Sequence, residues 1–159
     1  MSTSGNSKLW QNYQRDYWTK SWEGSSFSIE EKSDAVKNSN ALLPAIIKYT
    51  PASAKILEAG CGMGQWVMVL DQMGYNITGL DFSESTIEKL QAEYPNLQFV
   101  VGDVTDFEFK DESFDAMLSW GVIEHFEEGP SQALSEAYRV LSKDGISFVT
   151  VPCKNILHI

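Results

Sequence analysis

Short apolar runs and amphipathic stretches alternate along the chain from residue 55 onward. The amphipathic stretches predict helices at residues 65–73, 84–93 and 131–141. The short apolar runs predict strands at residues 55–59, 77–80, 97–101, 114–120 and 146–151. Strands that are almost continuously apolar and alternate with helices favour a parallel sheet covered on both faces. The pattern therefore predicts an α/β, doubly wound fold.

The first 50 residues have a different pattern, and we expect them to form an N-terminal helical cap on a core at residues 54–152 within a single domain of residues 1–159. Helical spacing places most of five aromatic side chains on one face, namely those of Trp10, Tyr13, Tyr17, Trp18 and Trp22. A second helical pattern covers residues 29–49 and ends before Pro51. Pro44 lies inside it, which predicts a kink or two shorter helices.

Composition limits the classes of partner. The chain has 159 residues, of which 43% are hydrophobic, and this is typical of one globular domain. Its formal net charge of −10 argues against nucleic acid, because phosphate binding requires clusters of Lys and Arg. Cys61 and Cys153 form no metal or redox motif, so we expect reduced thiols and a cytoplasmic location. No apolar run is long enough for a membrane helix. The sequence has no cluster of His, Cys and carboxylate residues at metal-ligand spacing, so we expect no metal site.

A glycine-rich turn, Glu58-Ala59-Gly60-Cys61-Gly62-Met63-Gly64, joins the first expected strand to the first expected helix of the core. Glycine lets the backbone take positive φ angles and approach a ligand closely. The dinucleotide pattern G-x-G-x-x-G fails in both registers, because Gln65 and Val67 occupy the positions of the third glycine. The Glu58 carboxylate would repel pyrophosphate but suits a ligand with an ammonium or sulfonium group, and S-adenosylmethionine carries both.

Two more carboxylates follow the next two expected strands. Asp81 can accept hydrogen bonds from both ribose hydroxyls, or can cap the helix that opens at Ser83. Asp103 can reach an adenine amino group, or can form an Asx turn. Because the carboxyl ends of parallel strands meet at one crevice, we expect these groups and the glycine-rich turn to form one ligand site.

These motifs, in this order, resemble those of class I S-adenosylmethionine-dependent methyltransferases, in particular the small-molecule group. ILEAGCGMG is similar to the family's cofactor loop, TGLDFS to its ribose-binding strand end and VGDV to its adenine-side segment. KDESFDAMLSWGVIEHF resembles the fourth strand with its following loop, and ALSEAYRVLSKDGISFVTVP resembles the next helix, turn and strand. The resemblance covers residues 54–152. It implies a Rossmann-like sheet, S-adenosyl-L-methionine as cofactor, and methyl transfer by in-line displacement to a small-molecule acceptor.

The resemblance also implies roles for individual positions. Those expected on the methionyl side of the cofactor are Glu58, Gly60, Cys61 and Gly62. Those expected on the ribose and adenine are Asp81, Phe82, Asp103 and Val104, and those expected near the sulfonium are Ser119 and Trp120. Three aromatic residues belong either to a helix that covers the cofactor or to ordinary packing on the sheet, namely Tyr13, Tyr17 and Trp18.

His125 is the candidate general base, because a hydroxyl acceptor must lose a proton and the imidazole pKa suits that task. The motif Glu-His-Phe is part of the general family pattern whatever the acceptor is, so a structural role in fixing the loop is the alternative.

The sequence departs from the family pattern at two places. The usual Pro-Gly-Gly turn before the fifth strand is Ser142-Lys143-Asp144-Gly145 here. The chain also ends soon after that strand, so we expect the sheet to lack the last two strands of the family's seven. The fifth strand would then be an open edge that can pair with a second copy in a homodimer. A truncated, noncatalytic cofactor-binding or assembly module is the alternative to a methyltransferase, and a nucleotide-dependent oxidoreductase is a third hypothesis.

Overall fold

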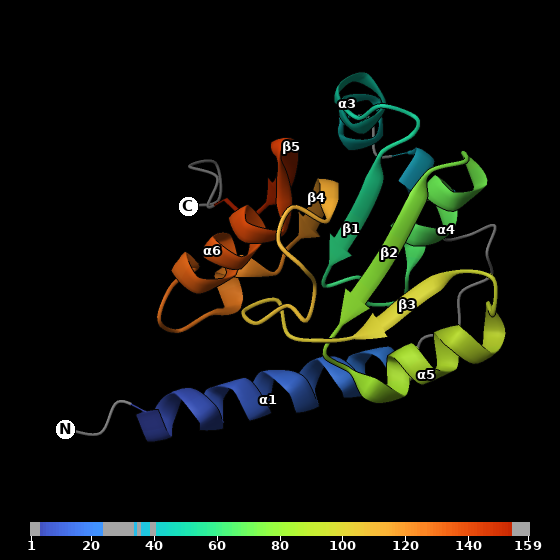
Figure 1. Ribbon diagram of the computed structural model, residues 1–159. Coiled ribbons are helices and arrows are strands. Elements are labelled where there is room, and N and C mark those ends of the chain that lie inside the picture. Colours follow the sequence, from blue (N-terminus) through green and yellow to red (C-terminus); the bar gives the residue numbers. More distant parts are fainter. Residues whose placement is uncertain (1–3, 24–33, 35, 39–40, 154–159) are drawn as a thin grey trace.

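The computed structural model describes residues 4–23, 34, 36–38 and 41–153 (Figure 1). In chain order the elements are α1 (Ser4–Glu23), α3 (Leu42–Tyr49), β1 (Lys55–Ala59), α4 (Gln65–Gln72), β2 (Asn76–Asp81), α5 (Glu84–Glu93), β3 (Gln98–Val101), β4 (Phe114–Trp120), the 3-10 turn η1 (Ile123–His125), α6 (Ser131–Val140) and β5 (Leu141–Thr150). No helix in these ranges has both the length and the apolar character needed to cross a membrane.

The five strands form one sheet in the order β3-β2-β1-β4-β5. Every pairing is parallel, with β2 on one side of β1 and β4 on the other. The sheet is therefore built outward in both directions from β1. In such a sheet the crevice beside the carboxyl ends of the two central strands is where a ligand binds. The predicted α/β, doubly wound fold is confirmed.

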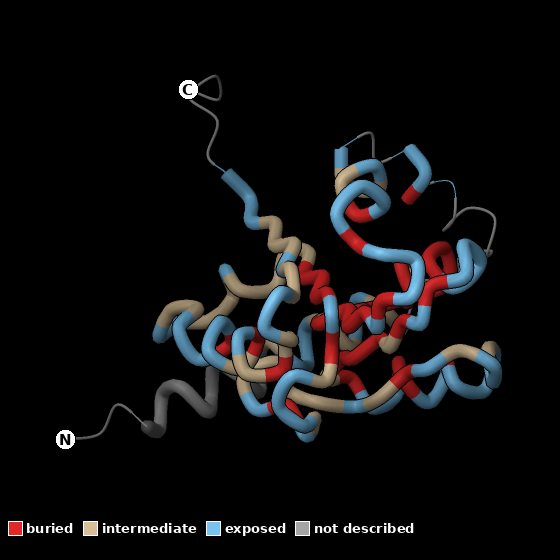
Figure 2. The backbone as a smooth tube through the Cα atoms, turned by 45° about the horizontal axis from the view of Figure 1, so that its top comes forward, coloured by how far each residue is buried: buried red, intermediate tan, exposed pale blue. Residues whose placement is uncertain are grey.

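The core lies on both faces of the sheet. Ile56 on β1 packs with Val67 and Leu70 of α4 on one face, whereas its neighbour Leu57 packs with Val140 of α6 on the other. Successive side chains of a strand point to opposite faces, so a strand that is buried on both sides must be apolar along its length. Figure 2 shows the buried residues gathered in the middle of the molecule, inside the outer helices.

The helix α1 lies beside α5 and runs past the carboxyl ends of the strands (Figure 1). Thr19 on α1 and Ser83 at the start of α5 are joined by a hydrogen bond of 3.0 Å between their hydroxyl oxygens. Part of the second predicted helical pattern, residues 29–33, 35, 39 and 40, lies outside the described residues. Pro44 stands in the first turn of α3, where its missing N–H removes no helical hydrogen bond.

The strand β5 begins at Leu141, earlier than predicted. The pairs Phe114↔Leu141 and Ala116↔Ile146 flank a bulge that holds the expected turn residues. At Gly145 an added Cβ would lie 2.9 Å from the Ser142 carbonyl oxygen, so this position requires glycine. The Pro-Gly-Gly turn is thus replaced by a bulge that keeps only the glycine. In the described sheet β5 is an outer strand, and none of its residues is fully buried.

Arg139 in α6 holds the irregular segment between β3 and β4. Its guanidinium donates hydrogen bonds to the carbonyl oxygens of Phe109 at 2.8 Å and Phe107 at 2.9 Å. It also pairs with Asp111 at 2.8 Å and Glu136 at 2.7 Å. The Glu136 carboxylate in turn accepts the Phe107 N–H at 2.8 Å, and the contact with Arg139 lowers the pKa of Glu136. These charge-assisted bonds satisfy backbone groups in a segment without a helix.

We expect Arg139→Met to lower the unfolding temperature and to speed hydrogen exchange at the Phe107 amide. The variant leaves the two carbonyl groups and the Glu136 carboxylate without their guanidinium partner. Lys143→Met removes the same charge from an exposed position and serves as the control. Equal effects of the two variants, measured by calorimetry and by exchange, would contradict this role for Arg139.

Candidate functional site

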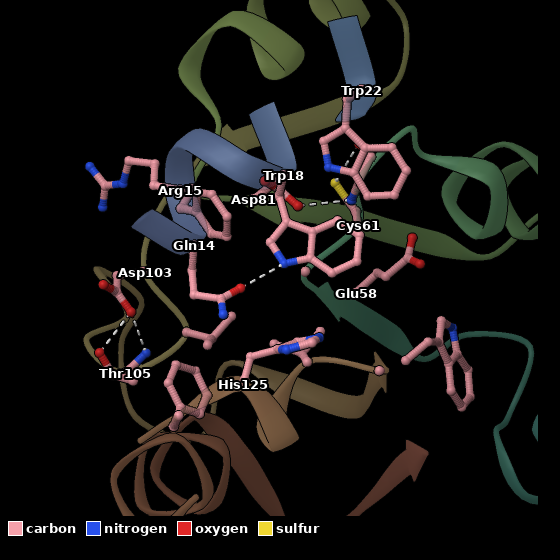
Figure 3. A pocket seen from close by; sticks show the side chains of 18 of the residues that line it. Gln14, Arg15, Trp18, Trp22, Glu58, Cys61, Asp81, Asp103, Thr105 and His125 are labelled. Carbon is pink, nitrogen blue, oxygen red and sulfur yellow. Dashed lines mark hydrogen bonds between the residues drawn. The ribbon is translucent and has the colours of Figure 1, made fainter. Parts of the chain in front are cut away.

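A cavity of about 640 Å³ lies at the carboxyl ends of β1, β2 and β4, where the direction of strand addition reverses. Its walls come from α1, from the turn after β1, from the residues that follow β2, β3 and β4, and from the start of α6. The volume is in the range of ordinary small-molecule sites, which is about 300–1,000 Å³. Figure 3 shows side chains from these separate segments facing one another.

Most residues expected at the site line this cavity. The expected cofactor positions that do so are Glu58, Gly60, Cys61, Gly62, Asp81, Phe82, Asp103, Val104 and Trp120, and Trp18 and His125 line it as well. Ser119, the neighbour of Trp120 in β4, is buried and is not among the lining residues. Tyr13 and Tyr17 are 59% and 53% exposed on α1 and do not line the cavity either.

The sequence analysis missed several lining residues on α1. Gln14, Arg15 and Trp22 border the cavity together with Trp18. Their spacing places the four on one side of the helix, and this signal was available once Trp18 had been chosen. Two other missed residues, Thr105 and Gln132, lie beyond Asp103 and in the first turn of α6, where no motif marked them.

The glycine-rich turn takes the shape that its sequence requires. Gly60 and Gly62 have φ angles of +84° and +49°, in the left-handed region that favours glycine. The N–H groups of Gly60 and Cys61 both donate to the Leu80 carbonyl oxygen, at 2.8 and 2.9 Å. A Cβ at Gly62 would lie 3.1 Å from Cζ2 of Trp22, so a larger residue would have to displace the Trp22 ring of α1. The turn is thus held against the end of β2 below and α1 above.

The Asp81 carboxylate is buried and binds two backbone amides. Oδ2 accepts the Gly62 N–H at 2.9 Å, and Oδ1 accepts the Ser83 N–H at 3.0 Å. Asp81 therefore accepts a hydrogen bond from Ser83, the residue before α5, which agrees with the alternative that Asp81 caps this helix. Burial raises the pKa of Asp81, and these amide hydrogen bonds partly oppose that effect. Each carboxylate oxygen has a further lone pair, so the bonds leave capacity for two hydroxyl donors.

Asp103 forms the Asx turn that was one of its two alternatives. Its Oδ1 accepts hydrogen bonds from the Thr105 N–H at 2.8 Å and from the Thr105 hydroxyl at 2.7 Å. The turn uses one carboxylate oxygen only, and Asp103 still lines the cavity. A structural role and a ligand contact are therefore compatible at this residue.

Glu58 is the most unusual polar group of the site. Its side chain is 2% exposed, and Oε2 has no hydrogen-bond partner among the described residues. Burial, and to a lesser extent the nearby Asp81 charge, raise the pKa of Glu58 well above its usual value, although the Val67 amide works against this. A buried carboxylate without a partner is costly. Its position beside the glycine-rich turn suits a ligand that brings a positive charge.

Tryptophan dominates the remaining lining. Four of the chain's five tryptophans border the cavity, namely Trp18, Trp22, Trp66 and Trp120. The Trp18 ring stacks on Trp22 at 5.4 Å and meets His125 edge-on at 5.4 Å, while Trp66 and Trp120 lie 5.1 Å apart. The Trp18 N–H donates to Gln14 at 3.1 Å (Figure 3). The N–H groups of Trp22 and Trp120 are buried and have no partner in the described part of the chain.

The charges around the cavity are mostly negative. The acidic lining residues are Glu58, Asp81, Asp103, Glu127 and Glu128. Arg15 is the one Lys or Arg among the described lining residues, and its guanidinium lies 5.7 Å from the centre of the Phe82 ring. Such a lining favours a cationic ligand over an anionic one. Within the same described residues, no group of three His, Cys, Asp or Glu side chains is placed to hold a metal ion.

Residues 57–149 match the family model described as a methyltransferase domain. The match covers more than half of the chain. The chain therefore belongs to the class I S-adenosylmethionine-dependent methyltransferases, and the cofactor of this family is S-adenosyl-L-methionine.

Individual relatives agree with this assignment. The chain is 33% identical over 101 residues to a probable S-adenosylmethionine-dependent methyltransferase of Mycolicibacterium smegmatis, covering 64% of this chain and 39% of that protein. It is 28% identical over 99 residues to the demethylmenaquinone methyltransferase of Chlorobaculum tepidum, and this match covers 62% of this chain and 40% of that protein. The chain is similar to the crystal structure of the PH0226 protein from Pyrococcus horikoshii, with a TM-score of 0.63 and 30% sequence identity. The similarity covers 73% of this chain and 58% of that protein. The chain spans about two-fifths of the length of these two curated relatives.

We expect the affinity for S-adenosylhomocysteine, whose methionyl part keeps the ammonium group, to rise with pH. Because the pKa of Glu58 in the folded protein is raised, this carboxyl keeps its proton above its usual pKa of 4.5. If the Glu58 carboxylate accepts the ammonium group, as we expect, binding releases this proton. The affinity for S-adenosylhomocysteine should increase as the pH rises from 4.5 to the raised pKa of Glu58, and should level off above that pKa. Calorimetry in buffers of different ionisation enthalpy measures the released proton.

Glu58→Gln serves as the matched variant. A raised pKa in the folded state makes the folding stability fall as pH rises from the unfolded value through the folded one. The amide removes that loss, so without cofactor the variant should unfold at a higher temperature than the parent chain at neutral pH. It should also bind S-adenosylhomocysteine about 10- to 100-fold more weakly, since a charge-assisted hydrogen bond contributes about 1.5–3 kcal/mol. A variant with the parent's pH dependence would contradict the role of Glu58.

Proposed function

We propose that this chain binds S-adenosyl-L-methionine in the cavity and directs its methyl group to a small-molecule acceptor. The observation that carries the proposal is the buried Glu58 carboxylate, which has an unpartnered oxygen beside a glycine-rich turn. The cavity thus offers a negative charge and a close backbone approach at one place, and the methionyl ammonium group needs both. The family membership supports the same cofactor.

The residues of the cavity fit the parts of this cofactor from one end to the other. Glu58 would hold the ammonium group, and the unpartnered N–H of Trp22 above Gly62 would donate to the methionyl carboxylate. Asp81 would accept hydrogen bonds from the ribose hydroxyls with its remaining lone pairs. Phe82 and Val104 would contact the adenine ring, and the second carboxylate oxygen of Asp103 would accept a hydrogen bond from the adenine amino group. Figure 3 shows Glu58 and Asp103 on opposite sides of Trp18.

When bound, S-adenosyl-L-methionine supplies an electrophilic methyl group for in-line displacement by the acceptor atom. The chain's own contribution is to align the two reactants and to exclude water. The aromatic rings of Trp18 and Trp120 offer electron-rich faces to a cation, which contributes about 0.5–2 kcal/mol. Where the acceptor is a hydroxyl, His125 would take its proton. The Trp18 ring, 5.4 Å from the imidazole, orients that side chain.

The two curated relatives support a methyltransferase over a noncatalytic module, since both are named as methyltransferases. The Chlorobaculum protein is named for demethylmenaquinone, which is a small molecule. The acidic lining of the cavity also favours a small molecule over a nucleic acid as acceptor. Both cysteines are free, and this supports a reducing, cytoplasmic location.

The outer edge of β5 supports a homodimer as a second proposal. An unpaired strand edge exposes backbone N–H and C=O groups that can extend the sheet into a second copy. We expect Ser147→Pro to convert a dimer into a monomer in sedimentation experiments, because Ser147 is exposed on β5 and proline cannot donate to a strand ladder. A parent chain that is monomeric at high concentration would contradict the dimer.

Cofactor binding is tested by thermal unfolding with S-adenosylhomocysteine. At about 100 times its dissociation constant, a ligand stabilises a protein by about 2.7 kcal/mol. For a chain of this size the unfolding temperature should rise by about 5–10 °C. NAD should give no shift, because the turn lacks the dinucleotide pattern. A chain that unfolds cooperatively but shows no shift, or shows the same shift with NAD, would refute the proposal.

Asp81→Ala should weaken binding of S-adenosylhomocysteine by about 1–3 kcal/mol, because it leaves ribose hydroxyls unpaired. It should also loosen the turn, since the Gly62 and Ser83 amides lose their acceptor. Asp144→Ala removes an equal charge from the exposed bulge of β5 and should leave the affinity unchanged. Titration calorimetry of both variants compares the two affinities, and an Asp81 variant with parental affinity would exclude the ribose contact.

A further inference from the structure

A pair of hydroxyl groups joins α1 to the start of α5. The Thr19 hydroxyl on α1 donates a hydrogen bond of 3.0 Å to Oγ of Ser83, the residue before α5. Ser83 is buried, so the acceptor end of this bond is removed from water. Figure 1 shows α1 and α5 lying side by side. The bond therefore fixes one point of α1 against the core of the protein.

Both side chains use this bond in place of their usual local partners. A serine at the start of a helix commonly accepts a backbone N–H of the first turn, but Ser83 makes no such bond with the described residues. Its hydroxyl lies 2.7 Å from Oγ1 of Thr86 and accepts from Thr19 instead. A threonine inside a helix commonly donates to the carbonyl oxygen of the preceding turn, and Thr19 gives its one hydroxyl proton to Ser83. A local preference that is given up indicates a role in the tertiary structure.

Ser83 is also the residue that holds the carboxylate expected at the ribose. Its N–H donates to Oδ1 of Asp81 at 3.0 Å, while Oδ2 of Asp81 accepts the Gly62 N–H at 2.9 Å. The Thr19 hydrogen bond thus ends on a residue that positions Asp81. The point where α1 is attached to the core therefore lies within the polar contacts that hold the site together.

The same stretch of α1 carries side chains that border the cavity. Trp18 and Trp22 are lining residues, whereas Thr19 is not (Figure 3). The Trp22 ring lies over Gly62, and the Trp18 ring centre is 5.4 Å from that of His125. Side chains of neighbouring turns move together when a helix moves as one unit. A shift of α1 that breaks the Thr19 bond would therefore also displace the two rings.

We propose that Thr19 is a positioning residue for the cofactor, because its hydrogen bond to Ser83 holds α1 where Trp18 and Trp22 border the cavity. Thr19 does not line the cavity, so it acts through the helix. Most of the stability of a helix in a protein comes from its packing on the rest of the chain, so each such contact affects how long α1 stays in place. This inference rests on the proposed function, because the cofactor is the ligand that the two rings would retain.

The variant Thr19→Val tests the bond, because valine keeps the branched shape of threonine but has no hydroxyl. S-adenosylhomocysteine should dissociate about three- to tenfold faster from this variant, the value of one ordinary hydrogen bond. Its affinity should fall by no more than the same factor, because it falls only as far as the binding-competent position of α1 becomes less populated. Stopped-flow tryptophan fluorescence measures the dissociation rate. Thr19→Ser keeps the hydroxyl and should restore the slower rate.

Thr78→Val is the matched control. It removes a hydroxyl that donates to Gln98 at 3.0 Å, between β2 and β3 and outside the cavity lining. This variant should keep the parental dissociation rate even where it lowers the unfolding temperature as much as Thr19→Val does. Without ligand, amide hydrogen exchange over residues 13–22 should be faster in Thr19→Val only. A purely structural role of Thr19 would change the unfolding temperature and leave the dissociation rate as it is.

Ser83→Ala breaks the same bond from the other side and keeps the backbone N–H that binds Asp81. Residues that act through one shared bond have effects that do not add. The double variant with Thr19→Val and Ser83→Ala should therefore release S-adenosylhomocysteine no faster than Ser83→Ala alone. Additive effects of the two substitutions would refute the bond as the cause.

The outcomes separate this inference from the proposed function. A parent chain that does not bind S-adenosylhomocysteine overturns the proposed function, and this inference with it. If the parent binds but Thr19→Val leaves the dissociation rate unchanged, the positioning role alone is wrong, even where exchange in α1 becomes faster. Should Thr19→Val not fold, Ser83→Ala decides the same question, because an unchanged dissociation rate in that variant would equally contradict the role of the bond.

Discussion

The Asp81 carboxylate is the constraint on which the rest of the site depends. It accepts one backbone N–H from the glycine-rich turn and another from Ser83, just before α5. One residue earlier, the Leu80 carbonyl oxygen accepts the N–H groups of Gly60 and Cys61. The end of β2 therefore fixes the path of the turn and the start of α5 together. These hydrogen bonds are all made within the chain itself, and a site that its own chain holds in the binding geometry lowers the cost of binding.

The site holds two carboxyl groups, Glu58 and Asp81, in a buried environment that disfavours their charged forms. The pKa values of Glu58 and Asp81 are raised chiefly by burial. Between them the Cys61 thiol has a pKa raised by burial and by the charges of both carboxylates, so it stays protonated and adds no third charge. Groups that lower the folding stability of a protein are typical of binding sites, where function requires an unfavourable local environment. The arrangement makes sense for a cationic ligand, which removes the conflict.

The sequence was sufficient to predict the strands of the sheet, because each strand is marked by a short apolar run within its own segment. The apolar runs that predict β1 and β4 agree with the observed bounds, since a buried central strand must be apolar on both faces. The start of β5 was not predictable, because its bulge depends on pairing with β4, where an added Cβ at Gly145 would lie 3.2 Å from the Asp115 carbonyl oxygen. Likewise Trp22 was recognised as aromatic but not as a site residue, because the face of α1 that meets the turn is set by tertiary packing.

Ser119 and Trp120 show where sequence reasoning could have been stricter. Neighbouring side chains of a strand point to opposite faces, so Ser119, which stands inside β4, was a weaker candidate than Trp120, which ends the strand. Trp120 borders the cavity from the end of β4, whereas α1 borders it through Trp18 and Trp22. Trp18 contacts His125 as well as Trp22, and Trp22 lies against Gly62 of the glycine-rich turn. One helix therefore joins the turn after β1 to the segment after β4, two parts of the site that are far apart in the sequence.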